Sequence, residues 1–185
     1  MVFKFISIFL CFFFTSCHTR QPEYIRLSHG ISDPYAKELK KTKGLCLIGS
    51  GGSMMDDVKK VNATYLSFAK LSVNEARNLY VEVVEGYLER FNRDEQIRPY
   101  LHNYPFTIEN MKLMITFKDE YHRRRDGEDV TLMFMARGNL VYYCSYDYEK
   151  EDFVDLHEEP YEEAVRIVRG GDSGSSGESG CSLAQ

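Results

Sequence analysis

One loop of this chain gathers residue types that could carry acid–base chemistry. The segment 98–107 reads RPYLHNYPFT, so His102 and Asn103 stand between two prolines. Histidine is well suited to act as a general base near neutral pH, and an amide or a tyrosine hydroxyl can polarise a bound substrate. His102 and Asn103 are therefore candidate catalytic residues, although the sequence places no Ser, Cys or carboxylate directly beside them.

The same loop also supports a structural interpretation. Its aromatic residues are Tyr100, Tyr104 and Phe106, and its prolines restrict the backbone at two points. A loop so rich in rings is expected to pack against the domain, with its Tyr hydroxyls and His102 satisfied by backbone groups. Alternatively, the three rings form part of a surface that binds a partner.

A second group of rings lies in the segment 140–146, which reads LVYYCSY. In a strand, side chains alternate between two faces, so Tyr142 and Tyr146 share one face and Tyr143 points to the other. An exposed pair of tyrosines would suit stacking on sugars or peptides, which makes Tyr142 and Tyr146 candidate binding residues. The alternative is a Tyr-rich core, because the chain has 13 Tyr and no Trp.

Three further motifs have simpler explanations than chemistry. The basic run 122–125 (HRRR) is typical of a solvated turn, although it could contact acidic lipid or a polyanionic glycan. The segment 49–53 (GSGGS) lacks the spacing of a phosphate-binding loop and is expected to be a flexible connection. The acids of 157–159 (HEE) suit the start of a helix. No ligand spacing indicates a metal site, and no cofactor is expected.

Composition favours one modest globular domain. The chain has 185 residues, of which 43% are apolar and 28% charged, and its net charge is −5. Residues 1–16 contain a single charged side chain, Lys4, so the remainder carries −6. An acidic chain gains no long-range attraction to nucleic acid or anionic lipid, so no nucleic-acid partner is expected.

The N-terminus has the pattern of a signal peptide. Lys4 is followed by an apolar run over residues 5–14. Ten residues rise only about 15 Å as a helix, which is too short to cross a hydrocarbon core of about 30 Å. A basic flank, a short apolar run and small residues are typical of a secretory signal.

The residues that follow, Phe14-Thr15-Ser16-Cys17, resemble the lipobox of bacterial lipoproteins. This resemblance implies that Cys17 is diacylated and becomes the mature N-terminus, and that the protein is exported and anchored to a membrane of the cell envelope. Phe14 departs from the usual Leu. In diderm hosts, an Asp directly after the lipidated Cys is associated with retention in the inner membrane. This chain has His18 at that position, so the resemblance favours the outer membrane. The alternative is a conventional signal peptide cut nearby.

Cysteine usage leaves one structural question open. Beyond the signal peptide lie Cys17, Cys46, Cys144 and Cys181, and acylation of Cys17 would leave an odd number of thiols. A Cys46–Cys144 disulfide is compatible with export. Two simply buried cysteines are equally compatible with the sequence.

Composition shifts divide the chain into four parts. We expect a signal peptide over 1–16, a polar tether over 17–32, a single domain over 33–169 with its core about 56–169, and a disordered Gly/Ser tail over 170–185. Within the domain, Asp33-Pro34 is expected to start a short helix that ends at Gly44.

The core pattern predicts an α+β fold. Ser72 and Glu75 form a capping box before a long apolar stripe that reaches Phe91. Strands are expected near 45–48, 61–70, 111–117, 130–136, 140–146 and 152–157. A last helix is expected to start at Glu158-Glu159-Pro160 and to run through Arg169. The predicted architecture is a long amphipathic helix packed on an antiparallel meander sheet, with a short C-terminal helix.

Two functional hypotheses follow. The preferred one is a lipid-anchored, non-catalytic binding or assembly module with a protein or glycan partner in the envelope. The alternative is a small cell-envelope hydrolase that uses His102. A concave pocket with His102 within hydrogen-bond reach of Ser, Asp or Glu would favour the enzyme, and a flat aromatic surface would favour binding.

Overall fold

The computed structural model describes residues 21–136 and 139–171. The predicted signal peptide, Cys17 and residues 172–185 of the predicted tail lie outside these ranges. In chain order, the α-helices and strands of the described residues are α1 (Glu23–Lys43), β1 (Cys46–Ser53), β2 (Lys60–Ser67), α2 (Val73–Arg93), β3 (Met111–Phe117), β4 (Leu132–Met135), β5 (Leu140–Asp147), β6 (Asp152–Pro160) and α3 (Tyr161–Gly171). Two short 3-10 helices, η1 (Arg98–Tyr100) and η2 (Ile108–Asn110), lie between α2 and β3.

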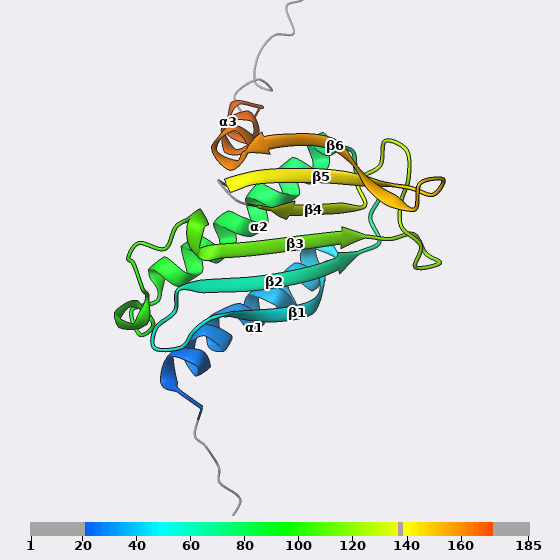
Figure 1. Ribbon diagram of the computed structural model, residues 1–185. Helices are drawn as coiled ribbons and strands as arrows, with labels where there is room; N and C mark the ends of the chain where they lie inside the picture. The colour runs from blue at the N-terminus through cyan, green and yellow to red at the C-terminus, as the bar shows by residue number, and fades with distance from the viewer. Residues whose placement is uncertain (1–20, 137–138, 172–185) are drawn as a thin grey trace, which may run out of the picture.

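The sheet follows the order of the chain, β1-β2-β3-β4-β5-β6 (Figure 1). Every neighbouring pair is antiparallel except β2 and β3, which run parallel. The α+β class is therefore confirmed, but the prediction of a purely antiparallel meander is wrong. The parallel pair arises because α2 connects β2 to β3, and a helix of this length carries the chain back to the end where β2 began.

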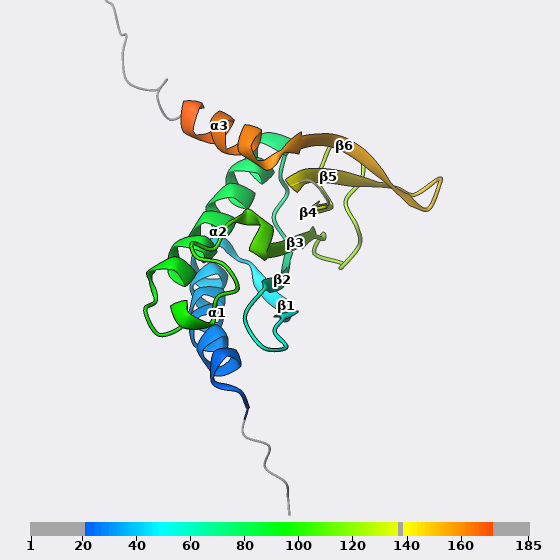
Figure 2. The same ribbon diagram turned by 60° about the vertical axis from the view of Figure 1, so that its left-hand side comes forward.

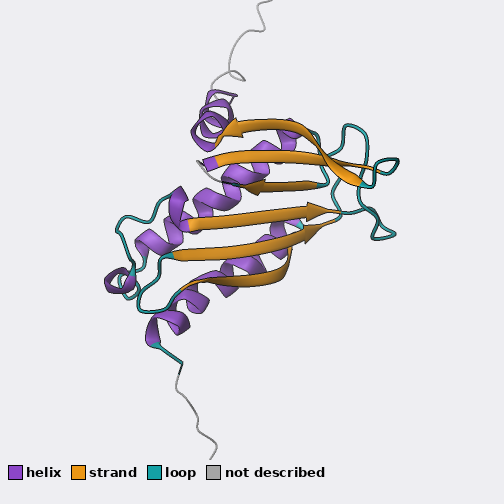
Figure 3. Ribbon diagram, viewed as in Figure 1, coloured by secondary structure: helices purple, strands orange, loops and turns teal. Residues whose placement is uncertain are grey.

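The two long helices cover one face of the sheet and leave the other face free of helices. Figure 2 shows α1 and α2 on the same side of the strands, and Figure 3 shows the strands in front of both helices. The core lies between these two layers, and its largest fully buried side chains include Tyr65, Tyr80, Tyr87 and Phe91. The opposite side is called the open face below.

Local signals explain α2 well. Its first turn has the predicted capping box, in which Ser72 and Glu75 each satisfy a backbone amide of the other. Gly86, a costly residue within a helix, has a packing reason. A Cβ atom at Gly86 would overlap the ring of Tyr35, whose hydroxyl reaches the carbonyl of Val83 at 3.2 Å. Glycine thus permits the close crossing of α1 and α2.

The predicted tether is largely wrong, because α1 begins at Glu23 rather than at Pro34. Leu27, Ile31, Tyr35 and Leu39 recur at four-residue steps and are buried against the core. Pro34 lies on the exposed side of the helix, where water can satisfy the carbonyl that loses its partner. The predicted end is confirmed: Gly44 adopts the left-handed conformation and caps α1.

The prediction of a flexible connection at 49–53 is also wrong. These residues belong to β1, which pairs with β2 from Cys46 to Ser53 with a bulge between Leu47 and Gly49. Glycine disfavours strands on average, but pairing with β2 outweighs that preference here.

The C-terminal helix is confirmed, and it extends past Arg169 into the start of the predicted tail, ending at Gly171. Arg169 donates to Glu85 of α2 at 2.6 Å, which joins the two helices at the surface. Within the described residues, no helix combines the length and the apolar character needed to cross a bilayer.

Candidate functional site

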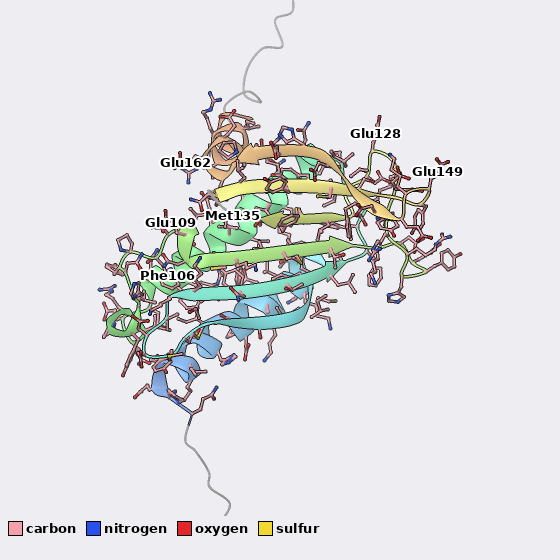
Figure 4. All side chains as sticks on the ribbon, in the orientation of Figure 1. Phe106, Glu109, Glu128, Met135, Glu149 and Glu162 are labelled. Atoms are coloured by element: carbon pink, nitrogen blue, oxygen red, sulfur yellow. The ribbon has the colours of Figure 1, made fainter. Side chains whose placement is uncertain are left out.

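The sheet is interrupted where β3 and β4 separate. Among the residues that the structure describes, only Met114, Ile115 and Thr116 of β3 pair with β4, so the first residues of β3 have no described strand partner on that side. Two adjoining hollows, of about 470 and about 510 Å³, lie at this end and share Lys60, Glu109, Ala136 and Asn139 in their linings. Figure 4 shows Glu109 and Met135 at this end of the sheet. We call the two hollows together the end hollow.

One wall of the end hollow is apolar. It is formed by Ile108, Met114, Phe134 and Met135. The ring of Phe134 stacks on that of Tyr142, with 5.3 Å between the ring centroids and 12° between the planes. This flat aromatic pair continues from the hollow onto the open face, so one predicted binding residue, Tyr142, adjoins the site.

The remainder of the end hollow is basic. Lys59, Lys60 and Lys112 line it, and Glu109 is the one carboxylate among the lining residues that the structure describes. Among the described residues, none of the three lysines forms an ion pair. These lysines are positive in a chain whose net charge is −5. Such a cleft raises the local concentration of anions.

His102 stands at the mouth of the end hollow with a carboxylate partner. Its Nδ1 lies 2.6 Å from Oδ2 of Asp57, and the His102 side chain is 52% exposed. The backbone fixes this position, because Val58 donates to the Tyr100 carbonyl at 2.8 Å and His102 donates to the Val58 carbonyl at 3.1 Å. When Asp57 accepts the Nδ1 proton, Nε2 becomes the basic nitrogen of the ring.

Asn103 also lines the end hollow, but its amide is directed to a structural partner. Its Nδ2 lies 3.4 Å from Oδ1 of Asn110, which is 5% exposed. Asn110 in turn accepts from the Thr107 amide and donates to the Lys59 carbonyl. Asn103 therefore belongs to the network that ties the loop to β2.

The aromatic residues of the loop fall into two groups. Phe106 is 2% exposed and stacks on Phe91, with ring centroids 5.4 Å apart. Tyr100 is partly buried and lies against Tyr24 of α1. Tyr104, by contrast, is 53% exposed. The structural interpretation therefore holds for Phe106 and Tyr100, and only Tyr104 presents most of its ring to solvent.

Replacing Phe106 by alanine is expected to lower the free energy of unfolding by about 3 kcal/mol, because the change leaves a cavity beside Phe91. Urea denaturation measures the difference. Tyr104→Ala in the same loop is the control and should change stability by less than about 0.5 kcal/mol. Equal effects of the two substitutions would contradict this division of the loop.

Tyr146 is held in a cluster rather than presented to a ligand. It is 9% exposed and contacts Tyr148 and Phe153 edge to face. The guanidinium of Arg124 lies 4.4 Å from the centroid of the Tyr146 ring. Such cation–π stacking gives the ring a structural partner.

The basic run 122–125 has structural contacts of the same kind. Arg123 pairs with Asp119, and Arg125 donates to the carbonyl of Phe68 at 2.7 Å. With Arg124 placed over Tyr146, all three arginines of the run have partners within the domain.

Cys46 and Cys144 are both free thiols. Cys46 lies on β1 and Cys144 on β5, and three strands separate them, which places them far beyond disulfide distance. The Cys144 thiol donates to Asp155 at 3.2 Å. Burial, with Asp155 beside it, raises the pKa of Cys144 to about 12, so this thiol is inert near neutral pH.

Sequence reasoning missed a buried polar cluster that joins α2 to β6. Arg77 donates to Glu159 at 2.7 Å, and their side chains are 8% and 4% exposed. Arg77 also donates to Asn74, and His157 Nε2 lies 3.3 Å from the second Glu159 oxygen. Burial raises the pKa of Glu159, but Arg77, Tyr143 and His157 outweigh it and leave the pKa below its ordinary value of 4.5.

The predicted role of 157–159 at a helix start is wrong. His157, Glu158 and Glu159 belong to β6, and α3 begins at Tyr161, with Glu162 and Glu163 in its first turn. Glu159 is one partner of the buried ion pair.

No group of three His, Cys, Asp or Glu side chains among the described residues is arranged to hold a metal ion. No protein-family model, curated protein or solved structure matches this chain.

Proposed function

We propose that this chain is an exported protein, anchored through a lipid on Cys17, that acts as a binding module in the cell envelope. Its ligand site is the end hollow, and the ligand is an acidic glycan. In a diderm host the anchor lies in the outer membrane. The observation that carries the proposal is the set of three unpaired lysines in a hollow of an acidic protein.

Charge supports an anionic ligand. Lys60 and Lys112 are exposed at the starts of neighbouring strands, and Lys59 precedes Lys60 directly. Three like charges without acidic partners repel one another, and a bound anion would relieve that repulsion. Long-range attraction by the whole chain is absent, so recognition depends on these local contacts.

The aromatic wall supports a ring-shaped ligand. The Phe134–Tyr142 pair is flat, and Phe134 borders the same hollow as Lys60 and Lys112. The apolar face of a sugar ring can pack on such a platform while the hydroxyls reach polar groups at the rim. Asn139 supplies one such amide beside the lysines. An acidic sugar could pack its ring on the aromatic wall and place its carboxylate beside the lysines.

Titration with a uronic-acid oligomer tests the proposal. We expect hexagalacturonate to bind in a salt-dependent manner and the neutral maltohexaose to bind more weakly. A double variant that carries both Lys60→Gln and Lys112→Gln should bind hexagalacturonate at least about tenfold more weakly, because each lysine provides a charge-assisted hydrogen bond. Isothermal titration calorimetry measures both.

The matched control removes two exposed lysines from α1 with the same substitutions, Lys37→Gln and Lys41→Gln. This variant has the same net charge as the double variant of the hollow and should retain full affinity. Equal weakening in both double variants would show a general charge effect and reject the hollow as the site.

A specific observation favours hydrolysis as a second candidate function. The His102–Asp57 pair has the arrangement of a general base oriented by a carboxylate, and it borders a concave site. The described lining of the end hollow contains no Ser, Thr or Cys, so His102 would have to activate water directly. This geometry meets the condition that favours an enzyme, a hollow with His102 within hydrogen-bond reach of a carboxylate. Binding is still the preferred function, because the described lining holds no nucleophile and His102 is 52% exposed.

His102→Gln separates these functions. If the protein only binds, hexagalacturonate should stay intact over long incubation with the wild type and with the variant. The substitution should then change the affinity by less than about threefold. The hydrolase would be established instead if the wild-type chain cleaves hexagalacturonate and the rate of cleavage falls at least about a hundredfold in His102→Gln and in Asp57→Asn. Reducing-end assays follow the reaction.

A further inference from the structure

Three segments of the chain meet at the end of the sheet where α1 begins (Figure 1). They are the start of α1, the turn between β1 and β2, and the loop between α2 and β3. The hydroxyl of Tyr24 on α1 donates to the carbonyl of Met55 in the turn at 2.6 Å. The ring of Tyr24 also lies 6.2 Å from the ring of Tyr100 in the loop, measured between centroids. These contacts join the three segments into one corner of the domain.

Two side chains of this corner expose apolar surface. Met55 is 83% exposed, and Tyr104 is 53% exposed. Among the described residues, no large hydrophobic side chain is more exposed than Met55. The pair of His102 with Asp57 joins the two segments, because each partner lies two positions from one of the exposed residues. We call Tyr24, Met55, Tyr100 and Tyr104 the anchor corner.

Charges of both signs border the anchor corner. The guanidinium of Arg98 lies over the ring of Tyr104, 4.7 Å from its centroid, and exposed Asp56 directly follows Met55. A zwitterionic lipid headgroup also carries both signs, so it complements this border. Asp56 limits any insertion to the headgroup region, because a charge is costly deeper in the bilayer.

The position of the proposed anchor indicates what covers this corner. Five residues lie between Cys17 and Glu23, so the lipid is attached at most about 20 Å from the first residue of α1. Tyr24 directly follows Glu23 and contacts Met55, which places the anchor corner beside the lipid. The loop after β3 lies at the other end of the sheet, about 20 Å away along that strand.

We propose that the anchor corner contacts the membrane that holds the lipid, so that Met55 enters the headgroup region and Tyr104 lies at its surface. This inference rests on the proposed anchor at Cys17. Tyrosine is enriched at membrane–water interfaces, and the flexible thioether of methionine adapts to an irregular surface. Because the anchor keeps the corner at a high local concentration beside the lipid, a small contact is sufficient to orient the domain.

This contact also gives the end hollow a position relative to the membrane. His102 stands at the mouth of the hollow and bonds Asp57, two residues after Met55. The hollow therefore lies at the membrane end of the domain, and the loop that contains Tyr121 lies at the far end.

Single tryptophans test the contact on the acylated mature chain in phosphatidylcholine vesicles. The chain has no Trp, so each variant carries one reporter. Lipids brominated in their acyl chains quench an indole that lies close to them. We expect these lipids to quench Met55→Trp by at least about half and Tyr104→Trp more weakly. Tyr121→Trp is the matched control: Tyr121 is 70% exposed at the far end, and its variant should lose less than about a tenth of its emission.

An added charge tests whether Met55 itself makes the contact. Met55→Asp in the Tyr104→Trp background should remove at least about half of the quenching, because a second carboxylate beside Asp56 opposes insertion. Tyr121→Asp in the same background adds the same charge at the far end and should leave the quenching unaltered. Circular dichroism confirms that each variant is folded. Equal effects of the two aspartates would overturn the inference.

Vesicle flotation separates this inference from the anchor on which it rests. A wild-type chain that does not float with the vesicles would reject the anchor, and the inference with it. A chain that floats but whose Met55→Trp variant is not quenched would overturn the inference alone. Equal quenching of the three reporters would also overturn it, because the domain would then have no fixed orientation on the membrane.

Discussion

Replacing Cys17 by serine is expected to move the protein from the membrane fraction to the soluble fraction while leaving the domain folded. The proposed acyl chains supply about 0.8 kcal/mol for each buried CH₂ group, and serine cannot carry them through a thioether. An acidic chain with a net charge of −5 has no electrostatic attraction to anionic lipid that could replace them. Fractionation after a high-salt wash measures the change.

Cys46→Ser is the matched control for this experiment. Cys46 is a free, partly buried thiol on β1, and its removal should leave the protein with the membranes. Circular dichroism of both variants confirms that the domain is folded. If Cys17→Ser still sediments with membranes after the wash, the lipoprotein proposal is wrong.

The early start of α1 gives the proposed anchor a geometric consequence. Five residues lie between Cys17 and Glu23, so the two Cα atoms are at most about 20 Å apart. The hydroxyl of Tyr24 donates to the carbonyl of Met55 at 2.6 Å, and Met55 is 83% exposed in the turn between β1 and β2. A lipid on Cys17 would therefore hold this turn close to the lipid headgroups.

The elements that were predicted correctly are those with local signals. The capping box at Ser72 and Glu75 identifies the start of α2, and strict alternation identifies β3 and its open-face residues Lys112 and Met114. Each of these signals depends on residues a few positions apart.

The elements that were missed depend on tertiary contacts. Pro34 and the polar residues before it favoured a tether, but Leu27 and Ile31 gain enough burial against the sheet to extend α1. Gly49–Ser53 has no strand propensity of its own and is held by β2. The parallel pairing of β2 with β3 likewise has no signature in either strand.

The candidate site was predicted in part. His102 and Asn103 were identified from the loop, whereas Asp57 lies 45 residues before His102 and no spacing relates them. Nor does the sequence indicate that β3 and β4 separate to form the end hollow. The buried ion pair has no local signal either, because Arg77 and its partner Glu159 are 82 residues apart in the chain.

Replacing Glu159 by alanine is expected to lower the free energy of unfolding by about 3–5 kcal/mol, because it leaves the Arg77 guanidinium buried without a counter-charge. The double variant Arg77→Met with Glu159→Leu should recover most of this loss, since two apolar side chains of similar volume need no partner. Urea denaturation at neutral pH measures both. A double variant as unstable as Glu159→Ala would show that the ion pair does not account for the effect.

The same pair predicts how stability depends on pH. The pKa of Glu159 in the folded protein lies below its ordinary value of 4.5, because Arg77 and its neighbours outweigh burial. Its contribution is therefore complete above pH 4.5 and is lost as the pH falls through the folded-state pKa. Wild-type protein should lose more stability than the double variant between pH 5 and pH 3, because the double variant has no carboxylate at position 159 to protonate. Parallel losses in the two proteins over this interval would place the acid sensitivity in other carboxylates.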